Sequence, residues 1–474
     1  MTRAGGTTRR KVAQHARAFR ALLLVGAVLG AFLGAAACEG SPSGGPAATQ
    51  ATRGTQASAP EAASPGTGAS GGAPPNEPPT LNGSSAVDEG SSSAPGALPR
   101  AVGKARPPAR GCVAIGAPAR ISRMPAPPAV TAWRNETVVA TLEVAGATES
   151  LRLWRVGASG VRSWLAKPVP EDVRRVRIAP PALLADTGAN SSDAVDVALV
   201  AGDGKVRVAT VRANGTSTDW LPFGDRADER FTPALARAGE DLMIAWTRVE
   251  AGASRLWLTR TRASKVVGSV DVSPPGMGGL APVFVREGNA TALYFMDARE
   301  GTSPVVRAVL GEDGTLGAPE VLRPVGTSAA LPELAVALAG KNPFIAYTVI
   351  GKAASTAIGI FSIKTKDFPP TALVPGTGYG ILHVAAATGL SRAVFAADVP
   401  LGADPKAPRE VVLHVVDDEG MGPPLALRGP TGSASNVAMA RTPDGTYAVA
   451  YADGAGTHLA FTACDDGSAA PRTP

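Results

Sequence analysis

Few residues of this chain combine a type and a spacing that could do chemistry. Three histidines lie beyond residue 37, and each stands alone in a strand-like stretch: His383, His414 and His458. A zinc site needs three or four ligands at characteristic spacing, so we expect packed or half-exposed side chains here and no metal site. The acidic run 417–420, Asp-Asp-Glu-Gly, lacks the alternate-residue spacing of a calcium loop and is typical of a solvated hairpin turn.

Two glycine-rich stretches match catalytic motifs without the elements that the chemistry requires. Residues 68–72, Gly-Ala-Ser-Gly-Gly, fit the pattern of a nucleophile elbow, but no strand precedes them and no helix follows. Residues 376–380, Gly-Thr-Gly-Tyr-Gly, come before a strand and not before a helix, so a phosphate cradle is not expected. The sequence therefore predicts no catalytic residue and no cofactor.

Cys38 ends an N-terminal leader. Residues 1–20 are basic and residues 21–37 form an unbroken apolar run, which is the order of a secretory signal peptide. The segment from Leu33 to Cys38, LGAAAC, resembles the lipobox of bacterial lipoproteins, in which the cysteine is lipidated and becomes the new N-terminus. The resemblance implies an exported chain anchored through Cys38 in the bacterial cell envelope, at the outer membrane or cell surface rather than the inner membrane. The alternative is an ordinary signal peptide cleaved after Ala37.

The charge of the chain is concentrated in that leader. Six of the 46 basic residues precede Cys38 and no acidic residue does, so cleavage leaves 40 basic residues against 40 acidic ones. A neutral chain lacks the positive surface that nucleic-acid binding requires. We therefore expect no nucleic-acid partner.

Residues 38–110 have the composition of a tether. They are rich in Gly, Ser, Ala, Pro and Thr and contain few large apolar side chains. Such a segment cannot bury enough apolar surface to offset the entropy lost on ordering. We predict a disordered linker that holds a globular domain away from a membrane.

The remainder of the chain is a series of short apolar strands in a repeating unit. One strand recurs with equivalent residues separated by 50, 51, 50 and 54 positions: Trp246, Met296, Tyr347, Ala397 and Tyr451. Within the unit at 230–277, four strand-like segments follow one another, and no helical period is present. Repeats of this length are typical of four-stranded β-propeller blades. We predict an all-β, seven-bladed propeller, with six or eight blades as alternatives and a pair of β-sandwiches as the competing fold.

Two features define how the strands connect and how the ring closes. Asp203-Gly204 and Asn214-Gly215 predict two-residue hairpin turns. The seventh unit lacks a fourth strand, while residues 113–122 form a strand that belongs to no unit, so we expect this segment to complete the last blade. Cys112 and Cys464 would then lie at the seam. In an exported protein they are expected to form a disulfide, the alternative being two free thiols.

The repeat architecture resembles that of sialidase-type propellers over about 340 residues. The aspartate-box turns of that family are absent, and no residue can be matched to its arginine triad or its Tyr/Glu pair. The resemblance therefore implies architecture and transfers no catalytic residue. The predicted organisation is a signal peptide at 1–37, a tether at 38–110, a propeller at 111–468 and a tail at 469–474.

The function expected from these observations is a membrane-anchored, extracytoplasmic binding or scaffold module with a protein or small glycan partner. The alternative is a carbohydrate-active enzyme, a glycoside hydrolase or lyase, with a site built from several blades at the channel mouth. Two carboxylates about 5–10 Å apart at that mouth would favour hydrolysis, and a mouth without clustered ionisable groups would favour binding.

Overall fold

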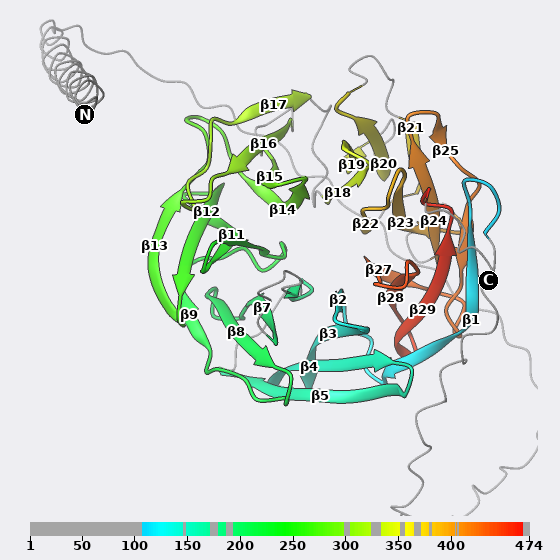
Figure 1. Ribbon diagram of the computed structural model, residues 1–474, viewed down its shortest axis with the longest axis horizontal. Helices are drawn as coiled ribbons and strands as arrows, with labels where there is room; N and C mark the ends of the chain where they lie inside the picture. Colours follow the sequence, from blue (N-terminus) through cyan, green and yellow to red (C-terminus); the bar gives the residue numbers. More distant parts are fainter. Residues whose placement is uncertain are drawn as a thin grey trace, which may run out of the picture. The chain divides into compact units, whose positions relative to one another are not determined.

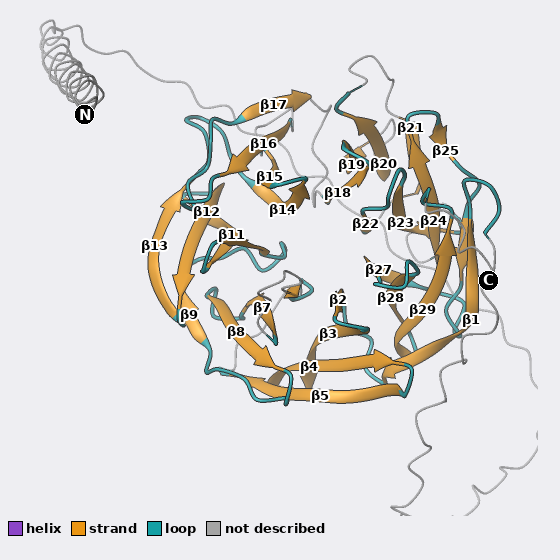
Figure 2. Ribbon diagram, in the orientation of Figure 1, coloured by secondary structure: helices purple, strands orange, loops and turns teal. Residues whose placement is uncertain are grey.

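The computed structural model of the protein describes residues 107–145, 148–170, 179–185, 193–297, 304–323, 333–350, 356–364, 371–378, 382–402, 404 and 407–467. These residues form antiparallel sheets and no helix (Figure 2). Seven sheets, each with four strands in its main path, surround an axis like the blades of a propeller (Figure 1). The predicted fold class is confirmed with seven blades. The predicted signal peptide, nearly all of the tether, and the tail lie outside the described residues.

The first four blades each take four consecutive strands. Blade 1 contains β2 (Pro128–Trp133), β3 (Glu136–Ala145), β4 (Thr148–Gly157) and β5 (Gly160–Val169). Blade 2 contains β6 (Ala182–Ala185), β7 (Ala194–Val200), β8 (Val206–Arg212) and β9 (Leu221–Phe223). Blade 3 contains β10 (Ala234–Ala238), β11 (Asp241–Glu250), β12 (Ala253–Arg262) and β13 (Lys265–Asp271). Blade 4 contains β14 (Leu280–Glu287), β15 (Ala290–Met296), β16 (Val305–Leu310) and β17 (Glu320–Arg323).

The last three blades include two departures from this scheme. Blade 5 contains β18 (Leu334–Ala339), β19 (Asn342–Ile350), β20 (Thr356–Ser362) and β21 (Thr371–Gly378). Blade 6 contains β22 (Val384–Ala387), β23 (Ala393–Pro400) and β24 (Arg409–Asp417), and its outer strand is split into β25 (Gly420–Met421) and β26 (Leu425–Leu427). Blade 7 contains β27 (Ser435–Arg441), β28 (Tyr447–Asp453), β29 (Gly456–Cys464) and, from the other end of the domain, β1 (Cys112–Ser122).

The ring closes through β1, as the incomplete seventh unit predicts. β1 pairs antiparallel with β29, beginning at Cys112 opposite Cys464, and lies beside it in Figure 1. The two cysteines form a disulfide that joins positions 352 residues apart, which confirms the predicted pairing. The last blade therefore has four strands, and β1 covers the edge of β29 that would otherwise be open.

The hydrophobic core is divided among the seven interfaces between neighbouring blades. One cluster joins blades 2 and 3 through Val206 and Ile244, and another joins blades 7 and 1 through Ala450 and Val139. The other five interfaces each have a corresponding cluster. Because each second strand is packed between two neighbouring blades, it is apolar on both faces, and every residue of β7 and β28 is buried. The repeated aromatics Trp246, Tyr347 and Tyr451 are core residues for this reason.

The hairpin turns at 203–204 and 214–215 differ from the predicted two-residue type. Only the glycines, Gly204 and Gly215, have positive φ, at 73° and 84°. The Oδ1 atom of Asp203 accepts the N–H of Lys205 at 3.1 Å, and Asn214 accepts that of Thr216 in the same way. A polar side chain that binds the backbone two residues on stabilises a longer turn, followed by one left-handed glycine. The sequence therefore predicts the positions of these turns correctly, but it does not predict their type.

Candidate binding site at the channel mouth

A cavity of about 370 Å³ lies on the axis, where the first strands of the blades begin. All seven blades contribute to it, each through residues at or just before its first strand. Six prolines form much of the wall: Pro127, Pro128, Pro180, Pro181, Pro233 and Pro282. Proline has a fixed φ and no N–H, so it can begin an inner strand whose first N–H would have no ladder partner. The wall is consequently rigid and largely apolar.

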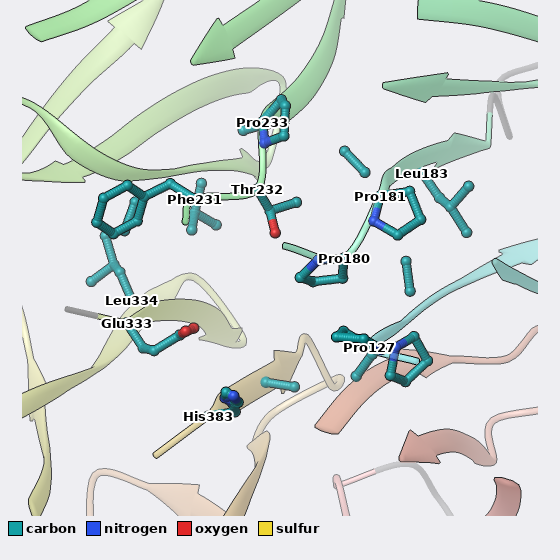
Figure 3. A pocket seen from close by; sticks show the side chains of 18 of the residues that line it. Pro127, Pro180, Pro181, Leu183, Phe231, Thr232, Pro233, Glu333, Leu334 and His383 are labelled. Atoms are coloured by element: carbon teal, nitrogen blue, oxygen red, sulfur yellow. The ribbon is translucent and has the colours of Figure 1, made fainter. Parts of the chain in front are cut away.

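A few polar side chains interrupt this wall: Arg230, Thr232, Glu333, His383 and Asn436. Figure 3 shows Thr232, Glu333 and His383 around the cavity, which they line from three different blades. Glu333 precedes β18 and His383 precedes β22, so these two groups come from adjacent blades. A concave, mostly apolar site with a few convergent polar groups is the usual form of a small-ligand site.

Asp398, a buried residue that does not itself line the cavity, positions two of these residues. It is completely buried at the end of the second strand of blade 6, β23. Its Oδ1 accepts the N–H of His383 at 2.7 Å, its Oδ2 accepts the N–H of Asn436 at 3.3 Å, and Arg409 pairs with it at 3.4 Å. A single carboxylate thus fixes the entrances of the inner strands of blades 6 and 7.

The same kind of hydrogen bond, from a backbone N–H just before a first strand to a side chain at the end of the second strand, recurs in two other blades. The N–H of Glu333 donates to Oγ1 of Thr348 at 2.9 Å, and the N–H of Gly278 donates to Oδ1 of Asp297 at 2.8 Å. Thr348, Asp297 and Asp398 each directly follow the repeated residue of the second strand. This role is not among those predicted from the sequence, although a Thr or Asp follows the repeated residue in four of the five aligned strands, at Thr247, Asp297, Thr348 and Asp398.

Arg230 is held by a neighbouring carboxylate. Its Nε and Nη2 atoms bind Asp228 at 2.8 and 2.5 Å, and its guanidinium lies over the ring of Phe231 at 5.6 Å. The hydrogen bond to Asp228 raises the pKa of Arg230 above its ordinary value. Because Asp228 is buried and opposite in charge, the pair brings no net charge to the rim.

The three histidines have different environments. His383 is half-buried at the cavity, and its Nδ1 has no hydrogen-bond partner among the described residues. His414 lies with Nδ1 at 3.3 Å from the carbonyl oxygen of Gly422. His458 is buried, binds Asp453 through Nε2 at 2.8 Å and stacks on the ring of Tyr451. Within the part of the chain that the structure describes, no group of three or more His, Cys, Asp or Glu could hold a metal ion.

The environment of Asp453 shows that the His458 pair is structural. Burial by itself would raise the pKa of Asp453, but the N–H groups of Ala455 and Thr431, together with His458, hold it below its ordinary value. Asp453 therefore serves as a buried acceptor for a loop and a ring. It is not among the residues that line the cavity.

The acidic run at 417–420 forms the predicted turn, since Asp417 pairs with Gly420 across the hairpin. Asp418 and Glu419 are exposed, as a solvated turn requires. Asp417 is not simply solvated, because it binds Arg110 at 2.6 Å and Arg392 at 3.0 Å. Arg110, the last residue of the predicted tether, is thereby attached to blade 6.

The disulfide lies on the face opposite the cavity. β27 begins at the cavity, and β28, β29 and β1 follow it across the blade in three successive antiparallel pairings. β1 therefore runs antiparallel to β27 and starts, at Cys112, where β27 ends. The chain enters the propeller at that face, and the cavity opens on the other. Cys38, the predicted lipidation site, lies outside the described residues.

Fold and site together define a closed seven-bladed β-propeller with a mostly apolar cavity, interrupted by a few polar side chains, at one end of its axis. Across those residues no helix is long and apolar enough to cross a membrane. No protein-family model matches the chain, and no curated protein matches it.

Several solved structures are distantly similar. Hydrazine synthase of Kuenenia stuttgartiensis has a TM-score of 0.45 and 12% identity, covering 71% of this chain and 95% of that one. A neuraminidase-like protein from A/bat/Guatemala has a TM-score of 0.42 and 9% identity, covering 75% and 94%. An α-L-arabinofuranosidase from Podospora anserina has a TM-score of 0.30 and 10% identity, covering 49% and 89%. Similarities this low assign neither a family nor an activity to the chain.

Proposed function

We propose that this chain is a membrane-anchored, extracytoplasmic binding module whose binding site is the axial cavity. The observation that supports this most directly is the cavity itself, a preorganised apolar cup into which polar groups from several blades converge. Its polar residues are held from behind by buried acceptors such as Asp398 and Thr348. Preorganisation lowers the entropy lost on binding.

The composition of the wall favours binding over hydrolysis. Glycoside hydrolysis ordinarily requires a pair of carboxylates flanking the scissile bond. Among the described residues that line the cavity, Glu333 is the one carboxylate. Asp228 and Asp398 lie behind the wall, where they bind Arg230 and the backbone of the inner strands.

The position of the chain entry suits a tethered receptor. Lipidation at Cys38 would place several acyl chains in the membrane, each contributing about 0.8 kcal/mol per buried methylene. The segment from Cys38 would then reach the propeller at the face opposite the cavity. The mouth would be directed away from the membrane and accessible to a small ligand or to a projecting group of a protein partner.

A variant that fills the cavity tests this proposal. Thr232→Trp places an indole at the mouth, and Val267→Trp is a matched control on the outer strand β13, where Val267 is 56% exposed. Each full-length chain is isolated from its native membrane, and its bound molecules are identified by mass spectrometry. We expect the Thr232→Trp chain to lose the species that the wild type and the control retain. Retention of every bound species by the Thr232→Trp chain would overturn the proposal.

A further inference from the structure

We infer that the propeller has a second, ionic lock at its seam, which keeps β1 in place when the disulfide is reduced or has not yet formed. Four residues make up this seam lock: Arg110, Arg392, Asp417 and Asp465. The lock lies where the chain enters the domain, on the face opposite the cavity, and its role does not depend on what the cavity binds.

The four residues form a closed cycle of contacts. Nη2 of Arg110 binds Oδ1 of Asp417 at 2.6 Å, and Nε of Arg392 binds Oδ2 of the same carboxylate at 3.0 Å. Nη1 of Arg392 lies 2.8 Å from Oδ2 of Asp465, which also accepts the backbone N–H of Arg110 at 2.7 Å. Because two arginines alternate with two carboxylates around the cycle, the charges of these four residues cancel.

Two members of the seam lock flank the disulfide. Arg110 stands two residues before Cys112, and Asp465 directly follows Cys464. The backbone continues the strand pairing past the cysteines, because the N–H of Asp465 donates to the carbonyl oxygen of Gly111 at 2.9 Å. The contact between Arg110 and Asp465 therefore holds the start of β1 against the end of β29 beside the disulfide.

The other two members belong to blade 6, although β1 and β29 belong to blade 7. Arg392 directly precedes β23, and Asp417 is the last residue of β24. The segment after β29 is bound to the same blade, since the carbonyl oxygen of Asp466 accepts the N–H groups of Ser391 and Arg392 at 2.9 and 3.1 Å. The start of β1 can separate from the seam only if the contacts of Arg110 with both blades break.

The burial of the cycle determines its strength. The side chain of Asp417 is 13% exposed, and those of Arg110 and Arg392 are each 26% exposed. Linked and partly buried charges stabilise a fold more than an isolated surface pair does, and salt still screens them in part. In the oxidised protein the disulfide already prevents the start of β1 from separating. The seam lock therefore limits local opening in the reduced protein.

Alkylation of the reduced protein tests the lock. The purified full-length chain is unfolded with a reductant and refolded, and the labelling of Cys112 and Cys464 by iodoacetamide is followed by mass spectrometry, which distinguishes them from Cys38. The two seam cysteines are 8% and 5% exposed, so labelling requires local opening of the seam. We expect Arg110→Met to be labelled about threefold to tenfold faster than the unmodified chain, because it loses a hydrogen-bonded contact.

Two further variants complete the comparison. Asp417→Asn should act like Arg110→Met, because it removes the charge on the other side of the same contact. Arg428→Met is the control: Arg428 is 71% exposed and pairs with Glu410 at the opposite end of β24, so its loss should leave labelling unchanged. In the oxidised protein, hydrogen exchange of the β1 amides should be the same in Arg110→Met and the unmodified chain.

A change of salt tests the lock without any variant. At about 1 M salt, where the Debye length is about 3 Å, labelling of the unmodified chain should become faster, and that of Arg110→Met should change less. Equal labelling rates in the unmodified chain, Arg110→Met and Asp417→Asn would overturn the inference, because strand pairing alone would then hold the seam. A reduced chain that does not refold would overturn it as well, because closure would then require the disulfide.

Discussion

The Oδ1 atom of Asp398 accepts the backbone N–H of His383 at 2.7 Å, and Asp398 in turn donates its own N–H to the carbonyl oxygen of His383 at 3.1 Å. This reciprocal pair connects the end of the second strand in blade 6 to the start of the first. The carboxylate is fully buried and also binds Asn436 of blade 7. A core residue with no exposed surface thus determines the geometry of the cavity wall.

Replacing Asp398 should loosen the mouth and destabilise the domain. Asp398→Ala removes the acceptor of the partly buried N–H groups of His383 and Asn436, which costs up to about 1–3 kcal/mol for each group left unsatisfied. Denaturant titration measures the loss of the free energy of unfolding. Asp225→Asn is the control, because Asp225 is 64% exposed in its pair with Arg248 and such pairs contribute about 0–1 kcal/mol. Equal stability of the two variants would contradict the role of Asp398.

The disulfide should contribute strongly to stability. Cys112 and Cys464 enclose nearly the whole propeller, and the chain-entropy model assigns about 6 kcal/mol to a loop of this length. We expect the double variant Cys112→Ser/Cys464→Ser to unfold at lower denaturant and to be insensitive to reductant. Cys38→Ser should unfold like the wild type. A double variant as stable as the wild type would show that strand pairing alone closes the ring.

Glu287 should make stability depend on pH in the acid range. Burial by itself raises the pKa of Glu287, but hydrogen bonds from Arg307 and Tyr294 lower it more, so the net pKa in the folded state is below its ordinary value. Because the folded-state pKa is the lower one, this stabilisation is present above the unfolded-state pKa of about 4.3 and is lost as pH falls through the folded-state pKa.

The variant Glu287→Gln tests this dependence. Its free energy of unfolding should fall less than that of the wild type between neutral pH and the acid range, as followed by denaturant titration at several pH values. Glu312→Gln, a change at an exposed turn, is the control. Parallel curves for Glu287→Gln and the wild type would rule out the contribution of Glu287.

Lipidation of Cys38 predicts that the chain changes from one cell fraction to another when this cysteine is replaced. In a bacterium that exports the chain, Cys38→Ser should move it from the membrane fraction to the soluble one, because a chain without acyl groups loses its anchor. Metabolic labelling with a fatty acid should mark the wild type and not the variant. Labelled Cys38→Ser, or an unlabelled wild type, would contradict the lipoprotein interpretation.

The architecture could be predicted because the apolar strands recur in the sequence at a regular spacing. Each second strand is packed between two blades, so its apolar residues recur about every fifty positions, as Trp246, Met296 and Tyr347 do. Closure could be predicted from a missing strand at one end and a spare strand at the other. The disulfide followed from the positions of Cys112 and Cys464 on either side of that seam.

The cavity could not be predicted, because each blade contributes only a few residues to it. Glu333 and His383 line the same cavity but are fifty positions apart in the sequence, and neither belongs to a local motif. Their roles arise from loops between blades, whose conformation the strand period does not encode. Thr348 and Asp398 indicate where these loops are bound to the second strands. They do not indicate which side chains the loops would present to the cavity.

Site-specific photocrosslinking tests most directly whether the axial cavity is the binding site. A photoreactive phenylalanine analogue is placed at position 232 or at position 267 of the full-length chain in its native cells, and adducts are identified by mass spectrometry after irradiation. We expect a defined adduct from position 232 at the mouth and none from position 267 on the outer strand. An adduct from position 267 alone would contradict the assignment of the axial cavity as the binding site.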